Sequence, residues 1–291
     1  MVGRVLTILA ITAGLATGAA AQRSRRTVVD ESTITRTLAF EGAGERTLDI
    51  RAINGSIRVQ GTDDRAVQMT IRKVIRAETA ADLSDAQRDV QLDFAERALR
   101  VGAIVRDSRN HVCGERSDDN RDWPRTRYDV TFDFTIRVPK NTGLRLCTIN
   151  GGEVRVTGTN GNFEVDNVNG LIEMTSVAGS GRAKTVNGPV TVSFTENPQD
   201  PSEFTTVNGN VVITFQDGLS ADLKMKTFNG GLFTDFEVEP LPQSAAASGE
   251  RRNGRFVYRS NSFTHVRAGR GGPEFTFETL NGNVRALRAT R

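Results

Sequence analysis

The sequence predicts an all-β protein, a single-stranded parallel β-solenoid with one short helix in its N-terminal part. Three observations predict this fold class. An Asn-Gly unit recurs at nearly constant spacing, and alternating apolar runs follow the units. Gly, Asn and Thr together exceed Leu, which favours turns and strands over helices.

The recurring unit is an apolar residue followed by Asn-Gly. It occurs seven times, and Thr precedes the apolar residue in five copies, at Thr148, Thr185, Thr206, Thr227 and Thr279. The pairs are Asn54-Gly55, Asn150-Gly151, Asn169-Gly170, Asn187-Gly188, Asn208-Gly209, Asn229-Gly230 and Asn281-Gly282.

The spacing of the units distinguishes two architectures. From Asn150 the steps are 19, 18, 21 and 21 residues, and the last step, to Asn281, is 52, which we interpret as two steps with an insertion. A meander of hairpins would turn every 8–12 residues or so and give alternate turns no shared consensus. The longer period therefore favours a coil of two strands and two corners, with an antiparallel meander or sandwich as the alternative.

Each part of the unit has an expected structural role. Stacked coils place equivalent residues about 4.8 Å apart, so the Asn side chains can form an amide ladder and the apolar positions a continuous column. Gly is expected at a corner that needs a positive φ, and Thr on a half-buried pleated surface. We interpret the Asn-Gly units as corners rather than ligands.

The rest of the chain divides around this repeat. Residues 22–44 form an N-terminal segment and residues 45–291 the solenoid domain, with loop insertions near 106–127 and 240–255. Alternation predicts strands in the first hundred residues and over Tyr128–Val138, and the Ala-rich, charged stretch Glu78–Arg88 predicts the helix.

Residues 1–21 are typical of a secretory signal peptide. Arg4 precedes a short apolar stretch, Val5–Leu15, and Ala19–Ala21 supplies a cleavage site. The alternative is a buried N-terminal helix. Gln22, not Cys, follows the expected cut, and no other stretch is apolar enough to cross a membrane. We expect an exported protein, periplasmic or at the cell surface, without a transmembrane anchor after signal cleavage.

Export affects the interpretation of the two cysteines. In an oxidising compartment Cys113 and Cys147 can form a disulfide. A metal site of His111, Cys113 and Cys147 is an alternative with poor spacing and no evident fourth ligand, and free thiols are another.

Basic residues gather at the C-terminal end. Residues 251–291 contain nine Arg and only Glu274 and Glu278 as acids. Arg251, Arg252, Arg255 and Arg259 are candidate contacts for an anionic ligand, or the charged cap that stops end-to-end stacking of coils. Nucleic acid is not an expected partner of an exported chain.

No catalytic, cofactor or metal motif is evident. His111 and His265 lie outside any nucleophile motif, and phosphate-binding loops are missing. Three carboxylate pairs were considered as acid/base or calcium sites: Asp63-Asp64, Asp118-Asp119, and Glu164 with Asp166. We interpret the first two as solvated turns and the third as the polar side of an amphipathic strand.

The Thr-Val-Asn-Gly units, the run Asp129–Pro139 before the first full unit, Thr234-Asp235-Phe236 and the closing run Thr279–Val284 resemble the bacterial putative-adhesin family, a domain of unknown function. The resemblance covers about residues 45–290. It implies a β-solenoid domain of exported or envelope-associated proteins and supplies no catalytic residues.

These observations predict a non-enzymatic, exported binding or structural module of the cell envelope that needs no cofactor. Its expected partner is an envelope glycan or another envelope protein. The alternatives are a polysaccharide-active β-helix enzyme, which would need a groove gathering carboxylates and an Arg from neighbouring coils, and an envelope-stress or scaffold protein.

Overall fold

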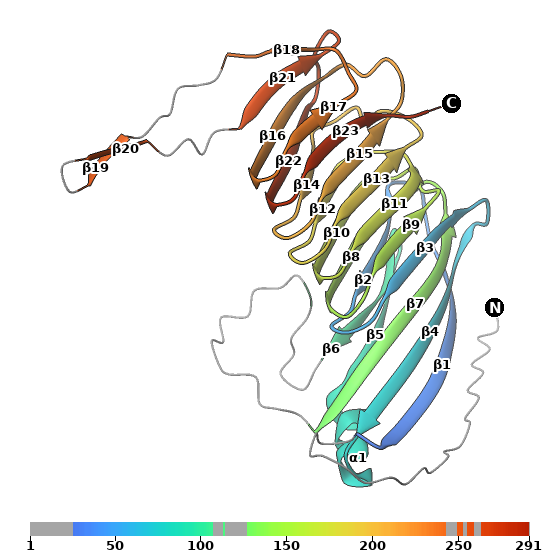
Figure 1. Ribbon diagram of the computed structural model, residues 1–291. Helices are drawn as coiled ribbons and strands as arrows, with labels where there is room; N and C mark the ends of the chain where they lie inside the picture. Colours follow the sequence, from blue (N-terminus) through green and yellow to red (C-terminus); the bar gives the residue numbers. More distant parts are fainter. Residues whose placement is uncertain are drawn as a thin grey trace.

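The computed structural model describes residues 26–106, 113, 127–242, 249–252, 255–258 and 263–290. These residues form an all-β structure with one short helix, as the sequence predicts. Two large sheets, one of ten and one of eleven strands, enclose the core between them (Figure 1). The predicted signal peptide, residues 1–21, lies outside the described residues.

The strands are given in their spatial order, which differs from their order in the chain. The ten-stranded sheet consists of β1 (Val28–Ala39), β4 (Ala66–Ala77), β7 (Tyr128–Pro139), β3 (Ile57–Thr62), β9 (Val154–Thr157), β11 (Ile172–Val177), β13 (Val190–Phe194), β15 (Val211–Phe215), β23 (Val284–Arg288) and β17 (Leu232–Thr234). The eleven-stranded sheet consists of β18 (Val238–Pro240), β21 (Thr264–Ala268), β16 (Ala221–Asn229), β22 (Glu274–Asn281), β14 (Ser202–Thr205), β12 (Gly181–Lys184), β10 (Phe163–Asn169), β8 (Thr142–Asn150), β2 (Arg46–Arg51), β6 (Arg100–Arg106) and β5 (Gln91–Arg97). A separate hairpin pairs β19 (Gly249–Arg252) with β20 (Arg255–Tyr258).

From β8 to β16 the chain alternates between the two sheets, and neighbouring strands within each sheet pair in parallel. The asparagines of the seven Asn-Gly units pair with one another from strand to strand and form one column. Its order is Asn54, Asn150, Asn169, Asn187, Asn208, Asn281, Asn229. The outlying copy at Asn54 therefore stacks directly on Asn150.

The column corrects our interpretation of the 52-residue step. Asn281 does not follow Asn229 after two further coils; it lies between Asn208 and Asn229. After β16 the chain passes through β17 and β18, and β21 then pairs antiparallel with β16. The next strand, β22, inserts between β14 and β16 and pairs in parallel with both. Sequence spacing cannot reveal this order, because an inserted coil and an added coil have the same phase.

Parallel pairing does not extend to the ends of the sheets, so the expectation of a parallel solenoid throughout is wrong there. β1, β4 and β7 pair antiparallel, as do β5 with β6 and β21 with both β16 and β18. Strands β5 and β6 are joined by Ala98 and Leu99 alone. Such a short connection makes a hairpin, because a parallel pair needs a crossover of a dozen residues or more.

The Asn column forms the expected amide ladder. Each Nδ2 donates to the Oδ1 of its neighbour, at 2.9 Å from Asn169 to Asn150 and at 2.7–2.8 Å in the four bonds that follow, through Asn187, Asn208 and Asn281 to Asn229. Beside it the Thr hydroxyls donate to the glycine carbonyl of the adjacent coil, at 2.8 Å from Thr185 to Gly170 and at 2.7 Å from Thr206 to Gly188. Thr therefore satisfies a corner carbonyl as well as fitting the strand.

The corner glycines are needed mainly for close backbone approach, which corrects the expected positive φ. Gly209 does not have a positive φ, but a Cβ built there would lie 2.2 Å from the carbonyl oxygen of Gly188. Gly151 is the reverse case, with φ +70° and no atom within 4 Å of the added Cβ. The stacking distance between coils, more than the turn conformation, requires glycine at most of these corners.

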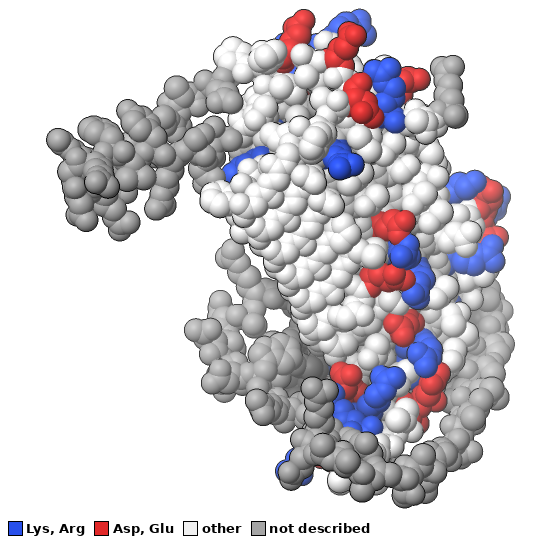
Figure 2. All heavy atoms as spheres, in the orientation of Figure 1, with Lys and Arg blue, Asp and Glu red and all other residues white. Residues whose placement is uncertain are grey.

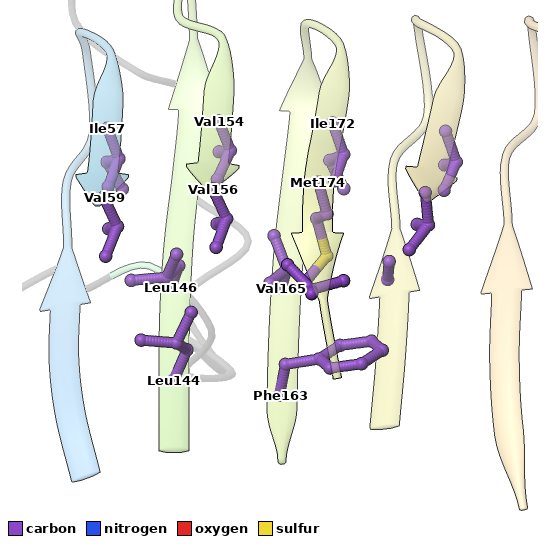
Figure 3. Close-up of a cluster of buried hydrophobic side chains, with 14 of the residues drawn as sticks. Ile57, Val59, Leu144, Leu146, Val154, Val156, Phe163, Val165, Ile172 and Met174 are labelled. Carbon is purple, nitrogen blue, oxygen red and sulfur yellow. The ribbon is translucent and has the colours of Figure 1, made fainter. Parts of the chain in front are cut away.

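Inward-facing side chains fill the space between the sheets (Figure 3). Aliphatic residues from alternate positions meet across the two layers in the middle of the molecule. Towards the C-terminal end phenylalanines take over, and Phe215 stacks on Phe194 and Phe275 with ring centroids 5.6 and 5.3 Å apart. These rings are fully buried.

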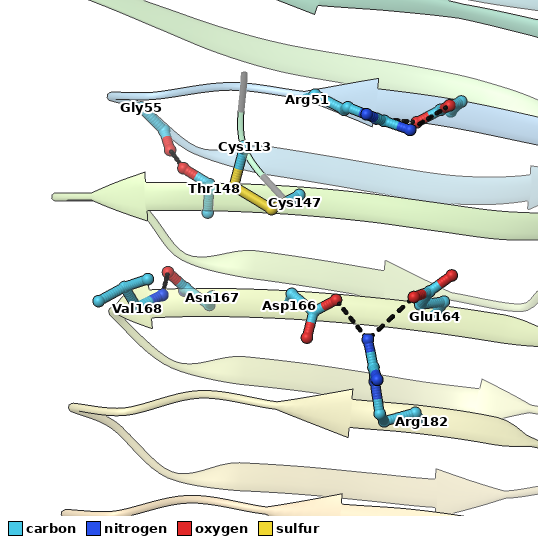
Figure 4. Close-up of a disulfide and its surroundings, with 11 residues drawn as sticks. Arg51, Gly55, Cys113, Cys147, Thr148, Glu164, Asp166, Asn167, Val168 and Arg182 are labelled. Carbon is cyan, nitrogen blue, oxygen red and sulfur yellow. Dashed lines mark hydrogen bonds and ion pairs between the residues drawn. A yellow bond between two sulfur atoms is a disulfide. The ribbon is translucent and has the colours of Figure 1, made fainter. Parts of the chain in front are cut away.

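The helix α1 (Ala80–Asp89) lies within two residues of its predicted bounds. Thr79 caps it, because its hydroxyl accepts from the N–H of Asp82 while the Asp82 carboxylate accepts from the N–H of Thr79. Cys113 and Cys147 form the expected disulfide, which ties the long insertion to β8 (Figure 4).

Candidate functional site

Three adjoining hollows follow the starts of the strands in the eleven-stranded sheet. The first, of about 400 Å³, spans β2, β8, β10 and β12 as far as Pro201 before β14. The second, of about 470 Å³, continues to β22, and the third, of about 330 Å³, reaches β16 and β21. The first two share Phe163, Glu164, Gly181 and Pro201, and the last two share Glu274.

We call this feature the strand-start groove and define it by its charged lining residues. These are Glu45, Arg46, Arg145, Glu164, Arg182, Asp200, Glu203, Asp222, Lys224, His265 and Glu274.

Strand alternation turns these side chains outward. On β10, Phe163 and Val165 are buried, whereas Glu164 and Asp166 face outward, as the sequence predicts. Parallel register then places equivalent outward residues opposite one another across the sheet. Arg145, Glu164, Arg182 and Glu203 follow each other on four adjacent strands and alternate in sign.

Arg182 connects the acidic groups of two strands' positions. Its Nη2 lies 2.9 Å from Glu164 and 3.0 Å from Asp166, and Arg145 Nε lies 3.0 Å from the other oxygen of Glu164 (Figure 4). Burial disfavours the charged guanidinium of Arg182, but Asp166 and Glu164 outweigh this and raise its pKa above the ordinary value. Both carboxylates are therefore held as anions by a permanent cation.

A second charged row crosses the ten-stranded sheet and appears as a band of alternating colours in Figure 2. Arg58 pairs with Glu153 at 2.6 Å, and Arg155 pairs with both Glu153 and Glu173. Burial opposes ionisation of Glu153, yet the hydrogen bonds from Arg155 and Arg58 lower its pKa. Both sheets thus carry neutralised rows, and the hollows above lie on the eleven-stranded sheet.

The Asn-Gly corner is different in character, because it carries apolar side chains beside the amide ladder. Ile149, Val168, Val186 and Val207 are half-buried there, while Leu280 and Phe228 are exposed by 46% and 72%. Figure 2 shows a broad area without charged side chains next to the band.

The other predicted residues are not brought into one site. Asp63 and Asp64 lie in an exposed turn, paired with Lys140 and Arg137. His265 lines the third hollow. His111 and Asp118-Asp119 lie outside the described residues, as does Arg259, and the side chains of Arg251, Arg252 and Arg255 on β19 and β20 are likewise not described. In the part of the chain that the structure describes, no three His, Cys, Asp or Glu residues are grouped to hold a metal ion.

Sequence reasoning missed the strand-start groove, although a signal was present. Arg145, Glu164, Arg182 and Glu203 are 19, 18 and 21 residues apart, which is the spacing of the Asn-Gly units. Equal phase means adjacency on one face once the coils stack. The sequence analysis used this phase for the corners and not for the charges.

Comparison with known proteins shows no match to a protein-family model and none to a curated protein. Solved structures match with low similarity. A putative cell adhesion protein from Clostridium sporogenes ATCC 15579 has 8% identity and a TM-score of 0.43, over 88% of this chain and 99% of that one. A putative adhesin from Bacteroides fragilis NCTC 9343 has 12% identity and a TM-score of 0.35, over 88% and 97%. A putative lipid binding protein from Parabacteroides distasonis ATCC 8503 has 8% identity and a TM-score of 0.26, over 89% and 97%.

Among the described residues, no helix is both long and apolar enough to span a membrane.

Proposed function

We propose that the protein is an exported, non-enzymatic binding module of the cell envelope, a parallel β-solenoid of putative-adhesin type that holds an extended glycan in the strand-start groove. The observation that carries the proposal is the run of three adjoining hollows along strand starts lined by alternating acids and bases. The resemblance in the Thr-Val-Asn-Gly units supports the envelope setting, as does the Cys113–Cys147 disulfide, which is favoured in oxidising compartments.

The shape of the groove favours a polymer over a small ligand. It crosses eight strands, from β2 to β21. Seven steps of about 4.8 Å give a length of about 34 Å. A shallow surface of this length has few ways to enclose a small molecule, but it can lie along several consecutive sugars.

The chemistry of the lining suits hydroxyl groups. Carboxylates accept and guanidinium groups donate hydrogen bonds, and both kinds alternate along the groove. Because the charges largely compensate, the groove favours neutral or weakly charged sugars over a strongly charged polymer.

The same ion pairs disfavour hydrolysis. A glycosidase of the common type needs one protonated carboxylic acid beside a carboxylate. Glu164 and Asp166 share Arg182, whose charge stabilises the ionised form of both. Neither is placed to act as the acid.

A retention and release assay tests the proposal. We expect residues 22–291 to sediment with peptidoglycan or with one of a panel of insoluble polysaccharides, and to release no soluble sugar on prolonged incubation. Sugar release that is lost in a Glu164→Gln, Asp166→Asn variant would contradict the non-enzymatic role. Neither retention nor release would favour a protein partner instead.

A further inference from the structure

The strand β1 leaves a long edge of the ten-stranded sheet open. It pairs with β4 over all twelve residues, and no described strand pairs with its other side. Edge strands are commonly protected by shortness, proline or a bulge. β1 has none of these, and Val28, Val29, Thr33, Ile34 and Thr35 give it strong strand propensity.

One side chain on this strand lacks a partner. The Nε of Arg36 is buried from solvent and makes no hydrogen bond, while the guanidinium lies 4.9 Å from the ring of Phe94. A buried donor without an acceptor is costly, so a carboxylate approaching along the edge would be stabilised there.

We propose that this edge binds the β1 of a second copy of the chain, antiparallel, with a two-fold axis at Thr33. The ten-stranded sheets of the two copies then form one continuous sheet, a β-augmentation of identical strands.

The register follows from three conditions. Residues directly opposite in an antiparallel pair lie on the same face, so a continuous sheet pairs even positions with even and odd with odd. Among such registers, the largest overlap of β1 with itself, eleven residues, occurs with the axis at Thr33 or at Ile34. The axis at Thr33 places Asp30 opposite Arg36, twice by symmetry, whereas the axis at Ile34 places Arg36 opposite Ser32 and Asp30 opposite Leu38.

Asp30 is available for this pairing. It faces the same side of the sheet as Arg36, and its one printed hydrogen bond, from Gln87 Nε2, is long at 3.4 Å. A salt bridge to Arg36 of the second copy would add an acceptor for a guanidinium that has an unused donor. This self-complementarity favours a second copy over an unrelated strand.

Cysteine crosslinking tests the register. The two Thr33 residues would face each other with Cα atoms about 4.5–5.5 Å apart, within the range of a disulfide. We expect Thr33→Cys to form a covalent dimer under mild oxidation. Thr35→Cys, which also faces outward, is the matched control, because the two Thr35 residues would be about 14 Å apart.

Light scattering then tests the charge pairs. We expect a dimer mass for residues 22–291, a dissociation constant raised about tenfold or more by Asp30→Arg, and recovery in the Asp30→Arg, Arg36→Asp variant. A monomer mass at all concentrations would overturn the proposal, as would a dimer in which Thr35→Cys crosslinks as readily as Thr33→Cys. Because β1 is remote from the strand-start groove, glycan retention is expected to persist in Asp30→Arg.

Discussion

Gly209→Ala is expected to lower the free energy of unfolding by about 3 kcal/mol or more. The added methyl group would lie 2.2 Å from the carbonyl oxygen and 2.5 Å from the carbonyl carbon of Gly188. Both atoms are backbone and belong to the adjacent coil, so relief requires the coils to separate and the hydrogen bonds of Asn208 and Thr206 to stretch. Denaturant unfolding followed by far-ultraviolet circular dichroism measures the effect.

Gly151→Ala is the matched control. It lies in the same column, but with φ +70° and open space around the added Cβ. We expect a loss of about 1–2 kcal/mol there, the usual cost of an L residue in a left-handed conformation. If Gly151→Ala destabilised the protein as much as Gly209→Ala, turn conformation rather than coil spacing would explain the glycines.

Phe215→Ala is expected to cost about 3–5 kcal/mol, the range for truncating a buried phenylalanine. Phe215 is fully buried and its ring contacts those of Phe194, Phe275, Phe277 and Phe236. It joins three coils, because Phe194, Phe215 and Phe275 come from successive turns of the chain in space. The loss of these contacts leaves a cavity that neighbouring rigid strands cannot fill.

Phe228→Ala provides the comparison, since that ring is 72% exposed. We expect a change of no more than about 0.5 kcal/mol. Thermal unfolding of both variants checks the pair. Equal destabilisation would mean that the Phe228 ring is covered by contacts that the described residues do not include.

Local sequence pattern predicted the strands and corners well. Alternation in the run Tyr128–Val138 and period-18 to period-21 phasing of Asn-Gly are both consequences of side-chain geometry, and they appear as β7 and the Asn column. The helix followed from composition, and Thr79 and Asp82 then fixed its start. Pairing of Cys113 with Cys147 followed from there being two cysteines in an exported chain.

Strand order and strand direction at the ends were not predictable in this way. The insertion of β22 between β14 and β16 depends on where β21 docks, which is a tertiary contact. A repeat phase gives the face on which a residue lies, but not the order in which coils stack. The antiparallel pairing of β1 with β4 is likewise set by a connection and not by either strand's own sequence.

The candidate site was missed for a related reason. Glu164 and Asp166 were assigned to the outer face of a strand, correctly, and considered as an isolated pair. Their significance comes from Arg145 and Arg182 on adjacent strands, 19 and 18 residues away. Neighbours across a parallel sheet are distant in sequence, so charge rows are visible only when the repeat is aligned with itself.

The central claim, that the strand-start groove is the ligand surface, is tested most directly by comparing two arginines on opposite sheets. Arg182 lies in the groove between Glu164 and Asp166, and Arg155 lies in the charged row of the ten-stranded sheet between Glu153 and Glu173. Both side chains are 43% exposed, so truncation costs comparable packing. The measurement is glycan retention by Arg182→Ala and Arg155→Ala, with circular dichroism confirming that both are folded. We predict a loss of about tenfold in affinity for Arg182→Ala and no change for Arg155→Ala. Equal retention by the two variants, or a loss confined to Arg155→Ala, would contradict the account.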